Sequence, residues 1–259
     1  MLNKGEFYNQ LSQKLEFSEE LNSCIEKTVQ TLAESETNIK KPGILLGKIQ
    51  SGKTRAFIGI IGLAFDNGYD VAIVLTKGTI ALAQQTYERL KRDFRIFAND
   101  DKLQIYDIMY LQKNFTPYEL QQKLIIVVKK ETNNMKRIID ALVKTYPNLS
   151  QKKLLIIDDE ADYASVGFKL DKDEEVFQIN KIAKQINELR EKSPKCDFLQ
   201  VTATPYSLYL QPDEFEINNK IFKPIRPAFT VLVPEYDGYI GGDYYFQESQ
   251  EENSVASYI

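Results

Sequence analysis

Short, nearly continuous apolar runs alternate along the chain with stretches in which apolar residues recur every three or four positions. The apolar runs occupy residues 43–46, 71–75, 124–128, 154–157 and 198–201. A run of four or five apolar residues without polar alternation is typical of a strand that is buried on both faces of a parallel sheet. The pattern therefore predicts five strands of that kind.

The stretches between these runs have the period of amphipathic helices. Apolar residues repeat at helical spacing over residues 56–64, 82–90, 138–142 and 179–189. The last stretch ends in Arg190 and Lys192, and cations stabilise the C-terminus of a helix. Alternating strands and helices predict an α/β fold, a doubly wound and mainly parallel sheet with helices on both faces.

The alternation is confined to the middle of the chain. Residues 1–40 are polar and helical in pattern, with Ser18 as a candidate N-cap, and we expect an N-terminal helical extension there. Residues 41–210 are expected to form the α/β domain. Residues 211–259 are richer in Pro, Tyr, Asp and Glu, so we expect a loop-rich extension or the start of a further domain.

A glycine-rich segment follows the first predicted strand. Residues 47–54 read Gly-Lys-Ile-Gln-Ser-Gly-Lys-Thr and fit the phosphate-loop pattern G-x-x-x-x-G-K-[ST] without a mismatch. Glycines let backbone N–H groups turn toward phosphate oxygens, and the helix N-terminus adds partial positive charge. We expect Lys53 to contact the β- and γ-phosphates and Thr54 to hold Mg²⁺. The predicted cofactors are ATP and Mg²⁺, bound by Gly47, Gln50, Ser51, Gly52, Lys53 and Thr54.

An acidic segment follows the fourth predicted strand. Residues 158–162 read Asp-Asp-Glu-Ala-Asp, at the end of a strand that would point carboxylates into the ligand crevice of a parallel sheet. We expect Asp159 to bind Mg²⁺ and Glu160 to act as general base toward water. With Lys53, they are the predicted catalytic residues. Two roles stay open for Asp158: it lies in an outer layer of the site, or it caps the turn.

A third polar segment, Val201-Thr202-Ala203-Thr204-Pro205, follows the fifth predicted strand. The hydroxyl groups of Thr202 and Thr204 can bond a neighbouring carboxylate such as Asp162, and could relay phosphate occupancy to a mobile partner. The alternative is an ordinary strand end that a proline terminates.

The amino-acid composition limits the kinds of catalytic, metal and binding site that the chain can contain. The chain has no histidine, which excludes a Ser-His-Asp triad, a Cys-His pair and His-ligated zinc within it. Cys24 and Cys196 lie too far apart in sequence to suggest a disulfide framework. A net charge of −4 excludes a whole-surface polyanion binder but allows a local basic groove. Because no apolar run approaches the roughly 20 residues of a membrane span and no secretory signal is visible, we expect a cytoplasmic protein without a membrane partner.

In their order along the chain, these segments resemble the first RecA-like domain of superfamily-two helicases. They are more similar still to the Z-one domain, a helicase-like ATPase domain of bacterial proteins associated with restriction or phage defence. The resemblance covers residues 40–247 and rests on residues 50–54, 158–165, 201–206 and 238–246. It implies a P-loop fold in which Lys53 and Thr54 bind nucleotide, Asp159 and Glu160 serve metal and base, and Thr202 and Thr204 couple hydrolysis to motion.

The resemblance also implies a nucleic-acid partner, DNA in preference to RNA. Loops that follow parallel strands would contact its phosphates, and the candidate residues are Lys77, Thr79, Lys129 and Lys130. The cluster of Arg89, Lys91, Arg92 and Arg95 is interpreted as a solvated helix face.

Helicases of this kind need a second RecA-like domain, which nothing after residue 247 could form. We therefore expect a second domain in cis or in trans, and weak hydrolysis by this chain alone. A nuclease or another defence effector is a further expected partner. The expected function is an ATP-driven motor domain on DNA. The alternative is a nucleotide-gated switch that regulates a partner protein without translocation. A metabolic P-loop kinase fits less well, because the sequence offers no acceptor site.

Overall fold

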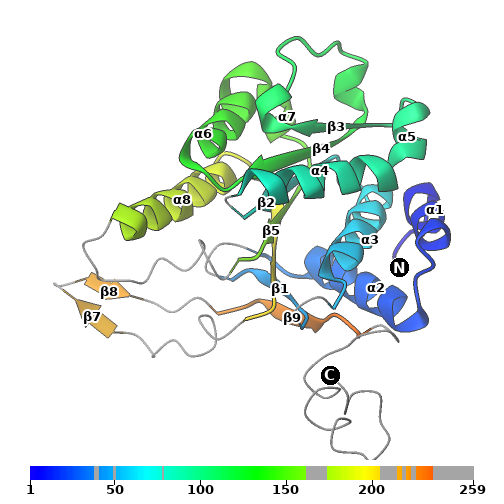
Figure 1. Cartoon of the computed structure of the whole chain (residues 1–259), viewed down its shortest axis with the longest axis horizontal. Helices are drawn as coiled ribbons and strands as arrows, with labels where there is room; N and C mark the ends of the chain where they lie inside the picture. The colour runs from blue at the N-terminus through cyan, green and yellow to red at the C-terminus, as the bar shows by residue number, and fades with distance from the viewer. Residues whose placement is uncertain are drawn as a thin grey trace, which may run out of the picture.

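The computed structural model describes residues 1–37, 41–48, 51–77, 79–161, 174–204, 215–217, 220–222 and 226–235. In the described part of the chain, seven parallel strands form one sheet in the order β3-β4-β2-β5-β6-β1-β9 (Figure 1). Their bounds are β1 (Gly43–Leu46), β2 (Val71–Thr76), β3 (Leu103–Asp107), β4 (Lys123–Lys129), β5 (Leu154–Asp159), β6 (Cys196–Thr202) and β9 (Phe229–Leu232). A separate antiparallel pair consists of β7 (Phe215–Ile217) and β8 (Lys220–Phe222).

Helices cover both faces of the sheet (Figure 1). One face carries α1 (Glu6–Lys14), α2 (Glu19–Glu34), α3 (Lys53–Asp66), α4 (Ile80–Asp93) and α5 (Arg95–Asn99). The other carries α6 (Thr132–Asp140), α7 (Pro147–Ser150) and α8 (Glu174–Glu191). Shorter turns are η1 (Ile108–Tyr110), η2 (Glu119–Gln121) and the π-helical η3 (Ala141–Thr145). The predicted doubly wound α/β fold is confirmed.

The central strands explain why the sheet is doubly covered. Successive side chains of a strand point to opposite faces, and in β2 the residues Ala72 and Val74 join one hydrophobic core while Val71, Ile73 and Leu75 join the other. All six residues of β2 are buried. A strand with an apolar core on each side has no polar face, which is the pattern that the sequence shows.

Two strands of the sheet were not predicted. β3 lies at one edge, and four of its five residues are only partly buried. β9 lies at the other edge, beside β1, with a burial pattern that is equally mixed. Edge strands need no continuous apolar run, so the run pattern misses them. The domain boundaries at residues 40 and 210 stay predictions, although β9 lies beyond the second of them.

The N-terminal helices pack directly on α3. Ser18 is the N-cap of α2 as predicted, since its side chain accepts a hydrogen bond of 3.2 Å from the backbone N–H of Leu21. A side chain at Gly59 of α3 would collide with Ile25 of α2, and one at Gly62 would collide with Leu11 of α1. The two glycines therefore allow close packing of these helices. Across the part of the chain that the structure describes, no helix combines the length and the apolar character needed to cross a membrane.

Candidate active site

The phosphate loop and the acidic segment attach to the end of the same strand. β6 lies between β1 and β5 in the sheet. On one side, the backbone N–H of Gly47 donates to the carbonyl oxygen of Thr202 over 3.1 Å; on the other, the N–H of Ala161 donates to the carbonyl oxygen of Val201 over 3.2 Å. Two segments more than 100 residues apart in sequence thus meet at the carboxyl edge of the sheet.

Two glycines of the phosphate loop serve different geometric needs. Gly52, the N-cap of α3, has a φ of +87°, in the left-handed region that favours glycine, and a side chain there would meet nothing within 4 Å. Gly47 instead allows close approach, because a Cβ there would lie 2.6 Å from the Oγ of Ser51. The pattern that predicted the loop therefore has a conformational reason at Gly52 and a steric one at Gly47.

The polar side chains of the loop point inward. Nζ of Lys53 donates to the carbonyl oxygens of Gly47, at 3.1 Å, and Lys48, at 2.7 Å. Oγ of Ser51 is buried and has no hydrogen-bond partner among the described residues. Gln50 lies outside the described residues. A loop that places a lysine and a buried hydroxyl beside its own backbone has polar groups available for an anion.

The described part of the acidic segment contains three carboxylates in three different environments. Asp158 is fully buried, and its Oδ1 lies 2.8 Å from Nζ of Lys130. Asp159 is partly buried, and its Oδ1 accepts a hydrogen bond of 3.1 Å from the N–H of Glu160. Glu160 is half-exposed, with a backbone φ of +51°, which is uncommon outside glycine. Asp162 lies outside the described residues. Asp158 is thus a buried partner of Lys130, and its role toward the site stays a prediction.

Burial raises the pKa of the Asp159 carboxyl from its ordinary value to about 6. Lys130 opposes this shift, whereas the nearby carboxylates of Glu160 and Asp158 add to it. A desolvated carboxylate with two acidic neighbours is a position at which a cation would be favourable, so Asp159 fits a magnesium ligand. Within the described residues, no group of three or more His, Cys, Asp or Glu residues could hold a metal ion without other ligands.

One cavity joins the two segments. It has a volume of about 140 Å³ and lies at the ends of β2 and β5, between the first turn of α3 and α4. Its lining includes Thr54 of the phosphate loop together with Asp159 and Glu160 of the acidic segment. The remaining lining residues are Thr76, Lys77, Leu82, Gln85, Thr86 and Arg89. Larger hollows lie elsewhere, between α1 and α2, beside α5 and at the amino edge of β6.

Arg89 and Thr76 are cavity residues that the sequence analysis missed. Arg89 was interpreted as part of a solvated helix face, and its side chain is 41% exposed, yet it also lines the cavity. Helical spacing in the sequence could have shown this, because Leu82, Gln85 and Arg89 are spaced by three and four residues. They therefore share one side of α4. Thr76 extends β2 by one residue beyond the apolar run, and its Oγ1 is buried without a partner among the described residues.

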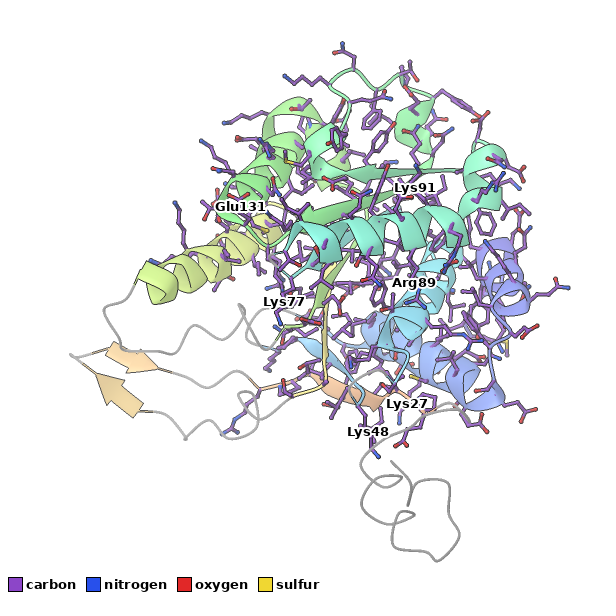
Figure 2. All side chains as sticks on the ribbon, in the orientation of Figure 1. Lys27, Lys48, Lys77, Arg89, Lys91 and Glu131 are labelled. Atoms are coloured by element: carbon purple, nitrogen blue, oxygen red, sulfur yellow. The ribbon has the colours of Figure 1, made fainter. Side chains whose placement is uncertain are left out.

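The four predicted nucleic-acid contacts have different surroundings. Lys130 is only 4% exposed, and its Nζ donates to Asp158 and to the carbonyl oxygens of Asp159 and Glu160, at 2.7 and 3.0 Å. It supports the acidic segment from inside and presents no charge at the surface, so the prediction of a phosphate contact there is not retained. Figure 2 labels Lys77 near the start of α4, and its Nζ lies 3.0 Å from Oε2 of Glu160. Lys129 is partly exposed at the end of β4.

The structure also shows the surroundings of two threonines that were predicted as site residues. Thr79 is the N-cap of α4, where its side chain accepts from the N–H of Leu82. Thr202 is fully buried, and its Oγ1 accepts a hydrogen bond of 3.0 Å from the N–H of Thr204. The predicted bond of Thr202 or Thr204 to Asp162 involves a residue outside the described part of the chain, so it stays a prediction.

Residues 14–207 match the family model described as type III restriction enzyme, res subunit (ResIII). No curated protein matches the sequence significantly. Among solved structures, the DEAD-box helicase Mss116 bound to ssRNA and UDP-BeF is similar with a TM-score of 0.50 and 17% identity, over 88% of this chain and 43% of that one. The DUF1998 helicase MrfA bound to DNA has a TM-score of 0.49 and 16% identity, over 87% of this chain and 29% of that one.

This chain spans less than half the length of either of these helicase structures. At these identities, the likeness to Mss116 supports the α/β P-loop fold and says nothing by itself about activity. The family model, in contrast, covers most of the chain and includes both the phosphate loop and the acidic segment. The chain belongs to the ResIII family, that of the res subunit of type III restriction enzymes.

Proposed function

We propose that the chain is a helicase-like motor domain that binds and hydrolyses Mg-ATP and acts on nucleic acid. The observation that carries the proposal is the shared cavity, to which the phosphate loop contributes Thr54 and the end of β5 contributes Asp159 and Glu160. P-loop enzymes that transfer phosphoryl groups need a lysine and a hydroxyl from the loop and carboxylates from a neighbouring strand. This cavity has members of both sets within one small volume.

In the proposed reaction, each residue either binds a charged group or accepts a proton. Lys53 would exchange its bonds to loop carbonyls for bonds to the β- and γ-phosphates. Thr54 and Asp159 would hold Mg²⁺, which, when bound, neutralises charge on the phosphate oxygens. Glu160 would orient water and accept its proton. The buried hydroxyl of Ser51 has no partner in the described part of the chain, which supports an anion at the loop, since such groups are rare.

The larger assembly is also a proposal. We propose that a second RecA-like domain, in cis or in trans, supplies an arginine to the γ-phosphate. A missing arginine finger costs roughly 10³–10⁵ in rate, so hydrolysis by this chain alone should be weak. Membership in a restriction-enzyme family supports DNA over RNA, and a nuclease or other defence effector as partner. The finer assignment to the Z-one type depends partly on residues 238–246, which lie outside the described residues.

Titration of a fluorescent ATP analogue tests the proposal, with Lys53→Ala as the variant and Lys27→Ala, an exposed lysine of α2 (Figure 2), as its control. A charge-assisted hydrogen bond contributes about 1.5–3 kcal/mol, so Lys53→Ala should weaken binding about tenfold or more. The Lys27→Ala variant should bind like the wild type. Equal affinity of all three proteins would contradict the proposal.

A backbone variant provides an independent check. Gly52 and Gly68 have φ values of +87° and +86°, and a side chain at either position would meet nothing within 4 Å. Gly52→Ala and Gly68→Ala should therefore lose similar stability, about 1–2 kcal/mol. Only Gly52→Ala should weaken ATP binding, because Gly52 starts the helix of the phosphate loop. Stimulation of ATP turnover by DNA then separates the motor from a nucleotide-gated switch, for which turnover would not respond.

A further inference from the structure

The proposed general base is already bound to a lysine. Nζ of Lys77 lies 3.0 Å from Oε2 of Glu160, and the two side chains are 41% and 44% exposed. Lys77 follows β2 and Glu160 follows β5, and these strands are neighbours in the sheet. Both residues line the cavity that also contains Thr54. The contact is therefore part of the proposed site, at its solvent side.

The backbone of Glu160 is held separately, from the interior. Lys130 donates to its carbonyl oxygen and to that of Asp159, and Asp158 anchors Lys130. The N–H of Glu160 is bonded to Asp159. With its backbone fixed in the left-handed region, Glu160 can change mainly the direction of its side chain. Among the described residues, Lys77 is bound to that side chain.

An ion pair of this exposure is easily exchanged. Charges that face solvent attract each other weakly, and salt screens them further. A phosphate diester offers an ammonium group equally strong, charge-assisted hydrogen bonds. The next described residue along the chain, Thr79, is also exposed, at the start of α4, so a phosphate can approach Lys77 from solvent.

We propose that Lys77 is a positioning residue that holds Glu160 until a backbone phosphate of nucleic acid takes its place. In the resting protein, Lys77 binds one oxygen of the Glu160 carboxylate and so directs this side chain toward itself. When nucleic acid binds, its phosphate engages Lys77 and the carboxylate turns toward the cavity. The inference rests on the proposed function and adds a physical reason for stimulation of hydrolysis by nucleic acid.

Nucleic-acid affinity gives a test that does not depend on turnover. If Glu160 and phosphate compete for Lys77, removing the charge of Glu160 must tighten nucleic-acid binding. We expect Glu160→Gln to bind a labelled single-stranded oligonucleotide about 2–5-fold more tightly at low salt, as the strength of an exposed pair allows. Glu88→Gln, which removes an exposed carboxylate of α4 that accepts a hydrogen bond from Gln84, controls for the change in net charge.

The double variant supplies the decisive comparison. In the Lys77→Met background, Glu160→Gln should no longer change affinity, because the shared partner is gone. Fluorescence anisotropy of the oligonucleotide measures all variants. An equal effect of Glu160→Gln and Glu88→Gln, or an effect of Glu160→Gln that persists without Lys77, would overturn the inference. If the wild type binds no nucleic acid, the proposed function fails with it.

Turnover of ATP by the full-length protein gives the second readout. Lys77→Met should raise turnover without nucleic acid several-fold and lower the stimulation ratio toward one. Lys77→Arg should restore both values, and Lys91→Met, on the exposed side of α4 (Figure 2), should change neither. If Lys77 only contacted phosphate, Lys77→Met would leave turnover without nucleic acid unchanged, and a higher concentration of nucleic acid would be needed for stimulation. That result would contradict the inference. Lys53→Ala is measured in parallel as a test of the proposed function. If the Lys53→Ala variant turned over ATP as fast as the wild type, the proposed function itself would be refuted, whatever the result at Lys77.

Discussion

Two lysine–carboxylate pairs flank the end of β5, and they differ chiefly in burial. The inner pair, Lys130 with Asp158, spans 2.8 Å with side chains that are 2% and 0% exposed. The outer pair, Lys77 with Glu160, spans 3.0 Å with side chains that are 41% and 44% exposed. The atoms and distances are almost the same, whereas the solvent around them is not.

This difference assigns the pairs to different tasks. When one partner of a buried pair is removed, the other is left as an uncompensated charge, which costs about 3–5 kcal/mol. An exposed pair is worth only about 0.2–1 kcal/mol, because water and ions replace either partner. The inner pair therefore fixes the backbone of the acidic segment, and the outer pair can be exchanged without unfolding the protein.

The largest effect is expected from breaking the inner pair. Lys130→Met should lower the free energy of unfolding by about 3–5 kcal/mol, since Asp158 stays buried without its counter-ion. The double variant Lys130→Met/Asp158→Leu should recover much of that loss, because it removes both charges. Urea unfolding followed by circular dichroism measures each value. A single variant as stable as the wild type would show that the pair is not buried in solution.

A smaller change in the free energy of unfolding, and one that stabilises the protein, is expected when Asp159 is replaced by Asn. Its folded-state pKa of about 6 exceeds the ordinary value of an aspartate, so the folded state binds more protons between about pH 4 and 6. Stability therefore falls as pH rises through that window and stays lower above it. Two pKa units correspond to at most about 3 kcal/mol. Asp159→Asn should stabilise the magnesium-free protein by up to that amount at pH 8.

The pH dependence serves as its own control. At pH 4 and below, Asp159 is protonated in the folded state, so Asp159→Asn should change stability little. Asp158→Asn should destabilise the protein at pH 8, in contrast to its neighbour, because Asp158 is matched by Lys130. Thermal unfolding of the three proteins at both pH values makes the comparison. Destabilisation by Asp159→Asn at pH 8 would count against the burial of an unfavourable charge.

The smallest effect is expected at the outer pair. Lys77→Met should change the free energy of unfolding by less than about 1 kcal/mol, and added salt should reduce the change further. Urea unfolding at low and high ionic strength would detect it. A loss as large as that of Lys130→Met would mean that Lys77 supports the fold, and the comparison between the pairs would no longer hold.

The sequence predicts the core of the sheet and the phosphate loop for physical reasons. Strands buried on both faces must be apolar throughout, so β2, β4 and β5 are visible as uninterrupted runs. A loop that wraps phosphate needs glycines at fixed positions, so Gly47 and Gly52 are visible as a motif. In both cases the requirement is local, and a single sequence is enough to show it.

What could not be predicted depends on distant partners. Lys130 has the sequence context of a surface lysine after a strand, and it is buried only because Asp158, 28 residues later, provides a counter-ion. Arg89 is partly exposed on its helix, but the cavity beside it is formed by residues from three other segments. Edge strands β3 and β9 have one open side each, so their residues follow no single rule of polarity.

The close packing at Gly59 and Gly62 has a consequence for the phosphate loop. Arg55, the residue after Thr54, donates to the carbonyl oxygen of Glu16 over 2.6 Å, and its guanidinium lies over the ring of Phe17. The first turn of α3 is thus attached to the turn between α1 and α2. Because α1 and α2 pack on α3 and bind its first turn, we expect a substitution on their outer surface to change how tightly the proposed site holds nucleotide.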